Sequence, residues 1–260
     1  SSYADYINNN IFKPLKMNAS YYGGSEIIPN RVSGYGKGAY GIYNAMYINM
    51  GWPHAAGSLL STVGDLNIWN HALANGKLIS KESYLKMISP FTLNDGTLSQ
   101  YGFGLGIIKL ADLEAISHSG GIPGFNTNAI YFPDNGLYVA VLNNTDNGIS
   151  GSLSVRLAAE ALGVKVPKFE AQPINESKLK PFIGRYKIND SSYRVLTLEH
   201  GKVYTQRDGG QKSEVLALSD NSFFYPKSMV YFTLEQNKDG EMTMNMYYDL
   251  ATTPQVAIKQ

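Results

Sequence analysis

The stretch AISHSGGIPGFNTNAIYFPDNGLYVAVLNN, residues 115–144, decides how this chain is interpreted. Its apolar runs at 127–132 and 137–143 are separated by the turn sequence PDNG, a pattern typical of a β-hairpin. Another strand-like run, 113–118, leads into the tetrapeptide HSGG at 118–121. This tetrapeptide has two interpretations. It forms the wall of an active site, or it is a tight turn whose histidine stacks on an aromatic ring.

Composition narrows the possible functions. The chain has 260 residues, of which 43% are hydrophobic and 17% charged, as in a folded globular protein. A net charge of +1 gives no indication of a nucleic-acid partner. The sequence has no apolar run long enough to span a membrane. The lack of cysteine excludes disulfides and suits an exported bacterial protein, so we expect a periplasmic or extracellular location with the signal upstream of residue 1.

Periodicity predicts mixed helices and strands in the first part of the chain. Residues 18–55, rich in Gly, Tyr and Asn, show little periodicity and are expected to be irregular. Thr62-x-x-Asp65 is interpreted as a capping box that begins a helix. The other expected elements are helices at 3–13, 81–88 and 150–162 and a strand at 101–110.

The last third has a different character. Residues 165–181 contain prolines and mixed charges, as a linker does. Eight short strand-like runs separated by Gly, Asn and Asp turns follow, which predicts a small β-barrel or sandwich. Two domains are therefore expected, 1–167 and 168–260. The eight runs are IGRYKI, YRVLTLE, KVYTQR, EVLALS, SFFYPK, VYFTLEQ, MTMNMYY and PQVAIK.

Several common site motifs are absent or misplaced. Gly36-x-Gly38-x-x-Gly41 matches the dinucleotide fingerprint, but it neither follows an expected strand nor begins an expected helix. No Gly-x-Ser-x-Gly occurs, which argues against an α/β-hydrolase. The four histidines are not spaced along the chain as metal ligands usually are, so neither a metal site nor a cofactor is predicted.

Four stretches together resemble one family. In order they are YADYINNNIFKPLKMNAS, AAGSLLSTVGDLNIW, YGFGLGI and the segment from His118 to Asn144. Residues 1–163 are similar to the C-terminal half of the catalytic domain of penicillin-recognising serine hydrolases, in the class C β-lactamase-like branch with D-aminopeptidases and esterases. The resemblance implies an α+β fold, an antiparallel sheet flanked by helices. Residues 178–260 resemble the lipocalin-like all-β barrel often appended to these enzymes.

The family mechanism needs a Ser-x-x-Lys nucleophile and a Tyr-x-Asn acid–base motif, which in family order precede the helix at 3–13. Both are therefore expected upstream of residue 1. Ser177-x-x-Lys180 fits the first pattern but lies in the linker. Tyr6-x-Asn8 and Tyr47-x-Asn49 fit the second; the first tyrosine is assigned to helix packing and the second to an irregular loop.

The resemblance also gives roles to residues of this chain. Gly121 is expected to supply an oxyanion-binding N–H, and Gly120 a close approach for an extended substrate. Ser119 is expected to bind a substrate carboxylate or amide. His118 replaces the commoner lysine, and its conditional charge favours aminopeptidase, amidase or esterase activity over efficient β-lactam hydrolysis. Further substrate contacts are expected from Tyr47, Asn144 and Asp146.

The sequence therefore predicts part of a serine hydrolase that acts on amide or ester bonds through an acyl-enzyme. Its expected substrates are D-amino-acid peptides, β-lactams or small esters, and this chain alone is expected to be inactive. The alternative is a binding or scaffold protein that keeps the fold without the chemistry. Expected partners are the peptide-like or ester substrate and either an oligomer or a complementing N-terminal segment, because an exposed apolar surface needs cover.

Overall fold

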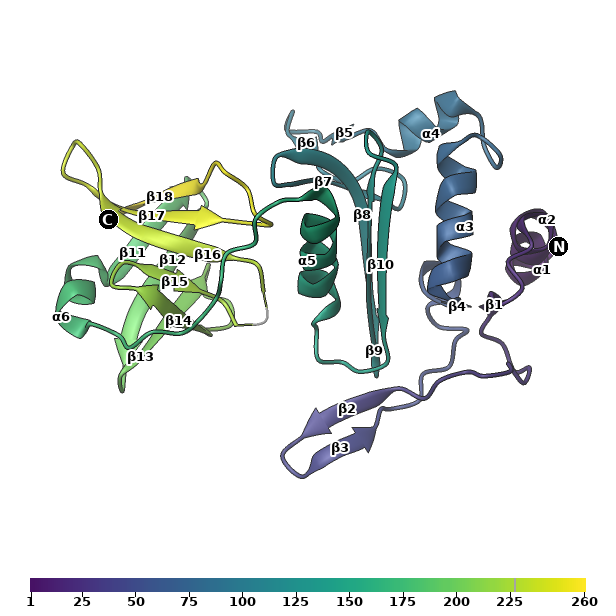
Figure 1. The fold of residues 1–260 in the computed structure, drawn as a ribbon, viewed down its shortest axis with the longest axis horizontal. Coiled ribbons are helices and arrows are strands. Elements are labelled where there is room, and N and C mark those ends of the chain that lie inside the picture. The colour runs from purple at the N-terminus through teal and green to yellow at the C-terminus, as the bar shows by residue number, and fades with distance from the viewer. Residues whose placement is uncertain (227) are drawn as a thin grey trace. The chain divides into compact units, whose positions relative to one another are not determined.

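The computed structural model describes residues 1–226 and 228–260 and divides them into two compact units (Figure 1). The first unit holds Ser1–Ile108 and Leu113–Ala158, and the second holds Lys109–Asp112 and Ala159–Gln260. The predicted boundary between 167 and 168 lies shortly beyond the end of helix α5 (Ser150–Leu162). In the described residues, every helix is too short or too polar to cross a membrane.

A four-stranded antiparallel sheet organises the first unit. Its strand order is β10-β9-β8-β7, so neighbours in sequence are neighbours in space. Figure 1 shows α5 against one face of this sheet and α3 (Val63–Ala74) against the other. Buried apolar side chains of its strands, including Ala115, Ile130 and Phe132, stabilise the sheet. The strands are β7 (Gly106–Leu110), β8 (Leu113–Ile122), β9 (Phe125–Phe132) and β10 (Leu137–Asn143).

Helix α3 begins as predicted, but its capping box is incomplete. The Thr62 hydroxyl accepts a hydrogen bond from Asp65 N at 3.3 Å, as an N-cap does. The Asp65 carboxylate instead accepts from Ala19 N at 2.9 Å and from Ser20 Oγ at 2.8 Å. The reciprocal bond expected of Asp65 in a capping box is therefore replaced, because this carboxylate joins the start of α3 to a distant segment.

The predicted helix at 3–13 is divided into α1 (Tyr3–Ile7), the π-helical turn η1 (Asn8–Phe12) and α2 (Lys13–Leu15). Helix α4 (Lys81–Met87) lies within the expected helix at 81–88, and Ser80 caps its N-terminus. The remaining short elements of this unit are β1 (Tyr21–Tyr22), η2 (His54–Ala56), β4 (Leu59–Leu60), β5 (Phe91–Thr92) and β6 (Leu98–Ser99).

The supposedly irregular segment 18–55 contains a hairpin, β2 (Tyr35–Gly38) with β3 (Gly41–Asn44). The Tyr43 ring covers Gly36 so closely that a Cβ there would lie 2.4 Å from Cζ of the ring. The glycines of the dinucleotide-like pattern are thus hairpin residues. The prediction missed the hairpin because glycine-rich strands have weak β-propensity.

The second unit is a closed barrel of eight antiparallel strands, β11 to β18 in sequence order. The prediction of an α+β region followed by a small all-β barrel is confirmed. Helices α6 (Glu176–Leu179) and η3 (Lys180–Phe182) precede β11, and Leu179 is fully buried in the barrel core. The expected strand 222–227 is shorter, and Lys227 lies outside the described residues. The strands are β11 (Gly184–Asn189), β12 (Ser192–Glu199), β13 (Lys202–Arg207), β14 (Ser213–Ser219), β15 (Ser222–Phe224), β16 (Tyr231–Gln236), β17 (Met242–Tyr247) and β18 (Gln255–Lys259).

Candidate active-site strand

The tetrapeptide 118–121 lies inside strand β8 and is not a tight turn. In the register with β9, His118 lies opposite Ala129 and Gly121 lies opposite Asn126. The reversal comes later, at Pro123-Gly124, where Gly124 adopts φ +79°. The turn interpretation of HSGG is therefore wrong, because pairing with β9 keeps this glycine-rich segment extended.

Strand β8 extends beyond its other neighbour, β7. Strand β7 begins at Gly106, beside Ser117: a Cβ on Gly106 would lie 3.4 Å from the Ser117 carbonyl oxygen. The next residues of β8 pass the start of β7, and His118, Ser119 and Gly121 are exposed. A strand edge of this kind can pair with an extended peptide through main-chain hydrogen bonds.

His118 has a partner that the sequence did not predict. Its Nε2 lies 3.0 Å from the hydroxyl of Tyr101, and the two ring centroids are 6.2 Å apart. Tyr101 belongs to the stretch YGFGLGI, which was assigned to a strand over 101–110, whereas the observed strand begins at Gly106. The missed signal is a tyrosine directly before a turn-forming Gly-Phe-Gly sequence, which holds its ring beside the next strand.

The backbone around Tyr101 is held firmly. Gly102 N donates to Leu105 O at 2.8 Å, and Phe103 N donates to Met87 O at 2.9 Å. A Cβ on Gly102 would lie 2.1 Å from the same Met87 oxygen, so only glycine fits there. The turn between Tyr101 and Gly106 is thus hydrogen-bonded to the end of α4, and this contact fixes the backbone position of Tyr101.

The four residues 118–121 do not share one face of the sheet. Successive strand side chains alternate, so His118 and Gly120 lie on one face and Ser119 and Gly121 on the other. A Cβ on Gly120 would lie 2.7 Å from Thr127 Oγ1, so the Thr127 side chain leaves no room for a larger residue at this position. At Gly121 a Cβ would meet no atom of the described residues within 4 Å. Gly121, more than Gly120, therefore leaves open space beside the strand.

The end of β10 anchors the β2–β3 hairpin. Asn144 donates from Nδ2 to Ser33 O at 3.0 Å, and its own carbonyl oxygen accepts from Tyr35 N at 3.0 Å. Asp146 N donates to Tyr35 O at 3.2 Å, and the Asp146 side chain is exposed. The structure thus gives Asn144 a structural partner, while substrate contacts by Asn144 and Asp146 stay predictions.

Two glycines bring the hairpin to the β8–β9 turn. A Cβ on Gly124 would lie 2.5 Å from Ala45 Cβ and 2.7 Å from Gly34 Cα. This contact places the base of the hairpin close to the open end of β8. Tyr47 follows β3 in a loop and is 75% exposed, so a substrate contact by this residue stays a prediction.

The alternative motifs have other roles. Ser177 donates from Oγ to Asn175 Oδ1 at 2.8 Å within the N-terminal cap of α6. Tyr6 is 56% exposed, so its expected role in helix packing is wrong; the buried aromatic of this segment is Phe12. Over residues 1–226 and 228–260, no cluster of three or more His, Cys, Asp or Glu side chains could hold a metal ion.

Residues 1–162 match the protein family Beta-lactamase. The chain is 26% identical over 270 residues to Penicillin-binding protein 4* of Bacillus subtilis (strain 168), a match covering 95% of this chain and 60% of that protein. The chain therefore spans about 60% of the length of this relative.

Solved structures share the fold. The octameric penicillin-binding protein homologue from Pyrococcus abyssi superposes with a TM-score of 0.58 at 23% identity, covering 99% of this chain and 60% of that one. A D-stereospecific amidohydrolase from Streptomyces sp. superposes with a TM-score of 0.52 at 28% identity, covering 63% and 49% respectively.

The class of protein is thus an α+β region of the β-lactamase and penicillin-binding-protein type, followed by an eight-stranded antiparallel barrel. The chain belongs to the Beta-lactamase family. The resemblance inferred from the four sequence stretches is confirmed.

Proposed function

We propose that this chain forms one wall of a serine hydrolase site that cleaves amide or ester bonds through an acyl-enzyme. The observation that supports this most is the exposed edge of β8 at His118–Gly121, beside the fixed hydroxyl of Tyr101. An extended, peptide-like substrate lies along this edge and pairs with it as an added strand.

Each residue of the edge has a part in the proposal. The N–H of Gly121 stabilises the developing oxyanion, and the open space at Gly121 lets the reacting carbonyl approach. His118 orients the substrate through its imidazole, and Ser119 donates a hydrogen bond to it. Tyr47, Asn144 and Asp146 contact the outer part of the substrate.

We place the nucleophile outside residues 1–260. In the described part of the chain, no hydrogen bond joins a serine hydroxyl to a lysine amine or a histidine ring, the pairing that activates a serine. A Ser-x-x-Lys and a Tyr-x-Asn encoded upstream complete the site in this proposal. A complementing segment of this kind, or a second copy of the chain, also covers exposed apolar side chains such as Tyr40 and Trp52.

The substrates that we favour are D-amino-acid amides, peptides and small esters. Histidine, whose charge is conditional near neutrality, stands in place of a permanently charged lysine. The similarity to a D-stereospecific amidohydrolase supports the same direction. The absence of cysteine supports a location outside the cytoplasm, which fractionation of the producing cells tests.

One labelling experiment tests the proposal. The chain 1–260 and the same chain extended by its upstream-encoded segment are each treated with a fluorophosphonate and with penicillin. Intact mass should show a stoichiometric adduct only on the extended protein. Labelling of residues 1–260 would overturn the assignment of the nucleophile to the upstream segment. An upstream segment that lacks the serine would favour a scaffold.

A second experiment tests the binding wall without turnover. An N-acetylated D-amino-acid dipeptide is titrated into isotopically labelled chain, with the L-enantiomer as the matched control. The amide signals of Ser119, Gly120 and Gly121 should shift more with the D-peptide. Equal responses to both peptides would remove the stereochemical part of the proposal.

A further inference from the structure

Arg194 lies inside the barrel near the end opposite α6. Strand β11 begins directly after η3, and Leu179 of α6 is buried in the core at that end. Strand β12 is antiparallel to β11, so its early residue Arg194 lies at the other end. Only 8% of Arg194 is exposed, and it shares an inward face with the fully buried Leu196.

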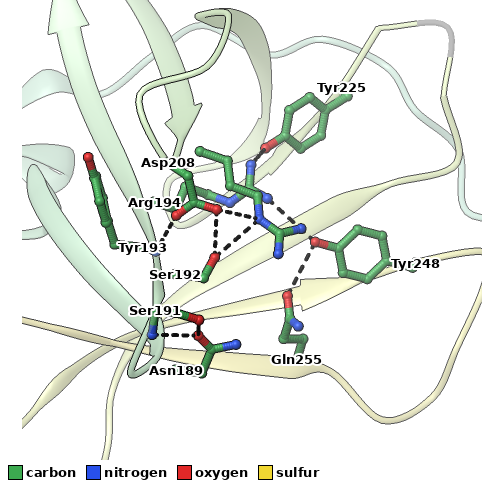
Figure 2. A network of polar contacts seen from close by, with 10 residues as sticks. Asn189, Ser191, Ser192, Tyr193, Arg194, Asp208, Tyr225, Tyr248 and Gln255 are labelled. Carbon is green, nitrogen blue, oxygen red and sulfur yellow. Dashed lines mark hydrogen bonds and ion pairs between the residues drawn. The ribbon is translucent and has the colours of Figure 1, made fainter. Parts of the chain in front are cut away.

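The guanidinium of Arg194 has only neutral partners. Nη1 donates to the hydroxyl of Tyr225 at 2.6 Å, and Nη2 donates to the hydroxyl of Tyr248 at 3.5 Å. Figure 2 shows Arg194 between these two tyrosines. Nε is buried and has no hydrogen-bond partner among the described residues. Two hydroxyl groups are thus the hydrogen-bond partners of a group that carries five N–H donors and a full charge.

Neither tyrosine is a counter-ion. Burial is the main influence on Tyr225 and raises its pKa, so this phenol stays protonated at neutral pH. Its hydroxyl also lies 2.7 Å from Thr205 Oγ1, and its ring centroid lies 6.0 Å from the Arg194 guanidinium carbon. The cation–π contact and two phenols leave the positive charge without a negative partner.

The carboxylate of Asp208, near this end of the barrel, is engaged elsewhere. Asp208 accepts hydrogen bonds from Ser192 Oγ at 2.7 Å and from Tyr193 N at 2.6 Å (Figure 2). It also pairs with Arg207, whose Nε lies 3.2 Å from Asp208 Oδ2. In the described residues, no carboxylate lies within 4.0 Å of an Arg194 nitrogen. A buried, unpaired charge is among the costliest features a protein interior can hold.

We propose that this end of the barrel binds a small carboxylate on the Nε/Nη2 edge of Arg194. Adjacent N–H groups of a guanidinium match the two oxygens of a carboxylate, and this edge holds the unpartnered Nε and the weakly bonded Nη2. The ligand is small, with one or two carbons, because buried apolar side chains fill the barrel core. The mouth of an eight-stranded barrel is a common place for one small ligand.

Tyr248 is the side chain that admits the ligand. It is half-buried, and its hydroxyl is 3.4 Å from Oε1 of the exposed Gln255. Both of its polar contacts are long, so rotating this ring breaks no strong hydrogen bond. After rotation, the ring uncovers the Nε/Nη2 edge while the contact between Arg194 and Tyr225 stays in place.

Nuclear magnetic resonance of the full 260-residue chain tests this site. Sodium acetate is titrated in place of sodium chloride at constant ionic strength, and the Arg194 Nε–H signal is followed. Acetate and formate should shift this signal saturably, whereas chloride and nitrate should not. A shift that is linear in acetate, or equal with chloride, would overturn the proposal as screening alone.

Two variants locate the effect. Arg194→Met should weaken acetate binding at least about tenfold, as expected when a charge-assisted hydrogen bond is lost, with backbone amide shifts near Tyr248 as the readout. Arg185→Met is the matched control, because Arg185 is exposed and its Cζ lies 3.7 Å from the centroid of the Tyr193 ring. Unaltered acetate binding in Arg194→Met refutes the site, and if that variant does not fold, the Nε signal of the wild-type chain decides.

Discussion

The hydroxyl of Tyr101 lies 3.0 Å from Nε2 of His118, across 17 residues of sequence. This contact joins a pinned turn to the exposed edge of β8. It commits Nε2 of the imidazole, so the other ring nitrogen is the one left to meet a ligand. Tyr101 is therefore expected to act as a positioning residue for His118.

Removing the Tyr101 hydroxyl should free the His118 ring. Tyr101→Phe keeps the ring and loses the hydrogen bond, so the tautomer populations of His118 should move toward those of a solvated histidine. Nitrogen-15 spectra of the four imidazoles measure this change. Tyr40→Phe, at a fully exposed tyrosine, is the control, and identical His118 spectra in all three proteins would contradict the positioning role.

Gly121 in β8 and Gly124 in the turn after it should differ sharply in their tolerance of a side chain. Gly124→Ala combines a positive φ with a Cβ 2.5 Å from Ala45 Cβ, so it should lower the free energy of unfolding by about 2 kcal/mol or more. Gly121→Ala meets open space and should change it by less than about 0.5 kcal/mol. Urea unfolding followed by tryptophan fluorescence measures both, because Trp52 and Trp69 both belong to the first unit.

The Gly121→Ala variant also separates folding from binding. Its added methyl group occupies the space that we assign to the substrate carbonyl, so the D-dipeptide should bind less well although the fold is intact. Undiminished binding by this variant would place the substrate elsewhere.

The buried carboxylate of Asp65 should contribute measurably to stability. Asp65→Ala leaves Ala19 N–H and the Ser20 hydroxyl without their acceptor and should cost about 2 kcal/mol. The same fluorescence-monitored urea curves report the loss. Asp95→Ala is the control, because Asp95 is exposed and bonds only Thr97 two residues away; an equal effect of both changes would show that the long-range bonds of Asp65 contribute nothing.

Two aspartates of the second unit should respond to pH in opposite directions. The Tyr193 N–H and the Ser192 hydroxyl lower the pKa of Asp208, so its stabilising effect is present above the ordinary aspartate pKa and is lost as pH falls. Burial raises the pKa of Asp249, so its ionised form costs stability at neutral pH, and this cost disappears on acidification.

Asparagine substitutions test both directions of pH dependence. The two aspartates have similar backbone conformations, because both have positive φ angles, which asparagine tolerates. At about pH 7, Asp208→Asn should destabilise the barrel and Asp249→Asn should stabilise it, and both differences should shrink toward about pH 3. Hydrogen exchange of barrel peptides in urea measures each variant against the wild type at the same pH. Parallel pH profiles for the two variants would contradict this assignment.

Much of the fold could be predicted because its signals are local. The apolar runs and the turn before β10 predict a hairpin, and Thr62 and Ser80 mark the starts of α3 and α4. Strand β8 was predicted to end at 118 but continues to Ile122, because glycine and serine have weak β-propensity and only pairing with β9 keeps them extended.

The candidate site was predicted only in part. The sequence indicates the edge at His118–Gly121, but nothing near His118 in the chain points to Tyr101. The turn at Tyr101 reaches β8 because Met87, at the end of α4, holds Gly102 and Phe103. Likewise, the strand-like sequence of β12 has apolar residues on both faces, so its pattern does not tell which way Arg194 points.

The sequence by itself determined the family, the order of the elements and the two-part organisation, because motifs, caps and alternation depend on residues close together in the chain. The tertiary structure alone decided the partners of Asp65, His118 and Arg194. Each of these side chains is hydrogen-bonded to a residue at least 17 positions away in the sequence. Such contacts depend on strand register, barrel closure and close backbone packing.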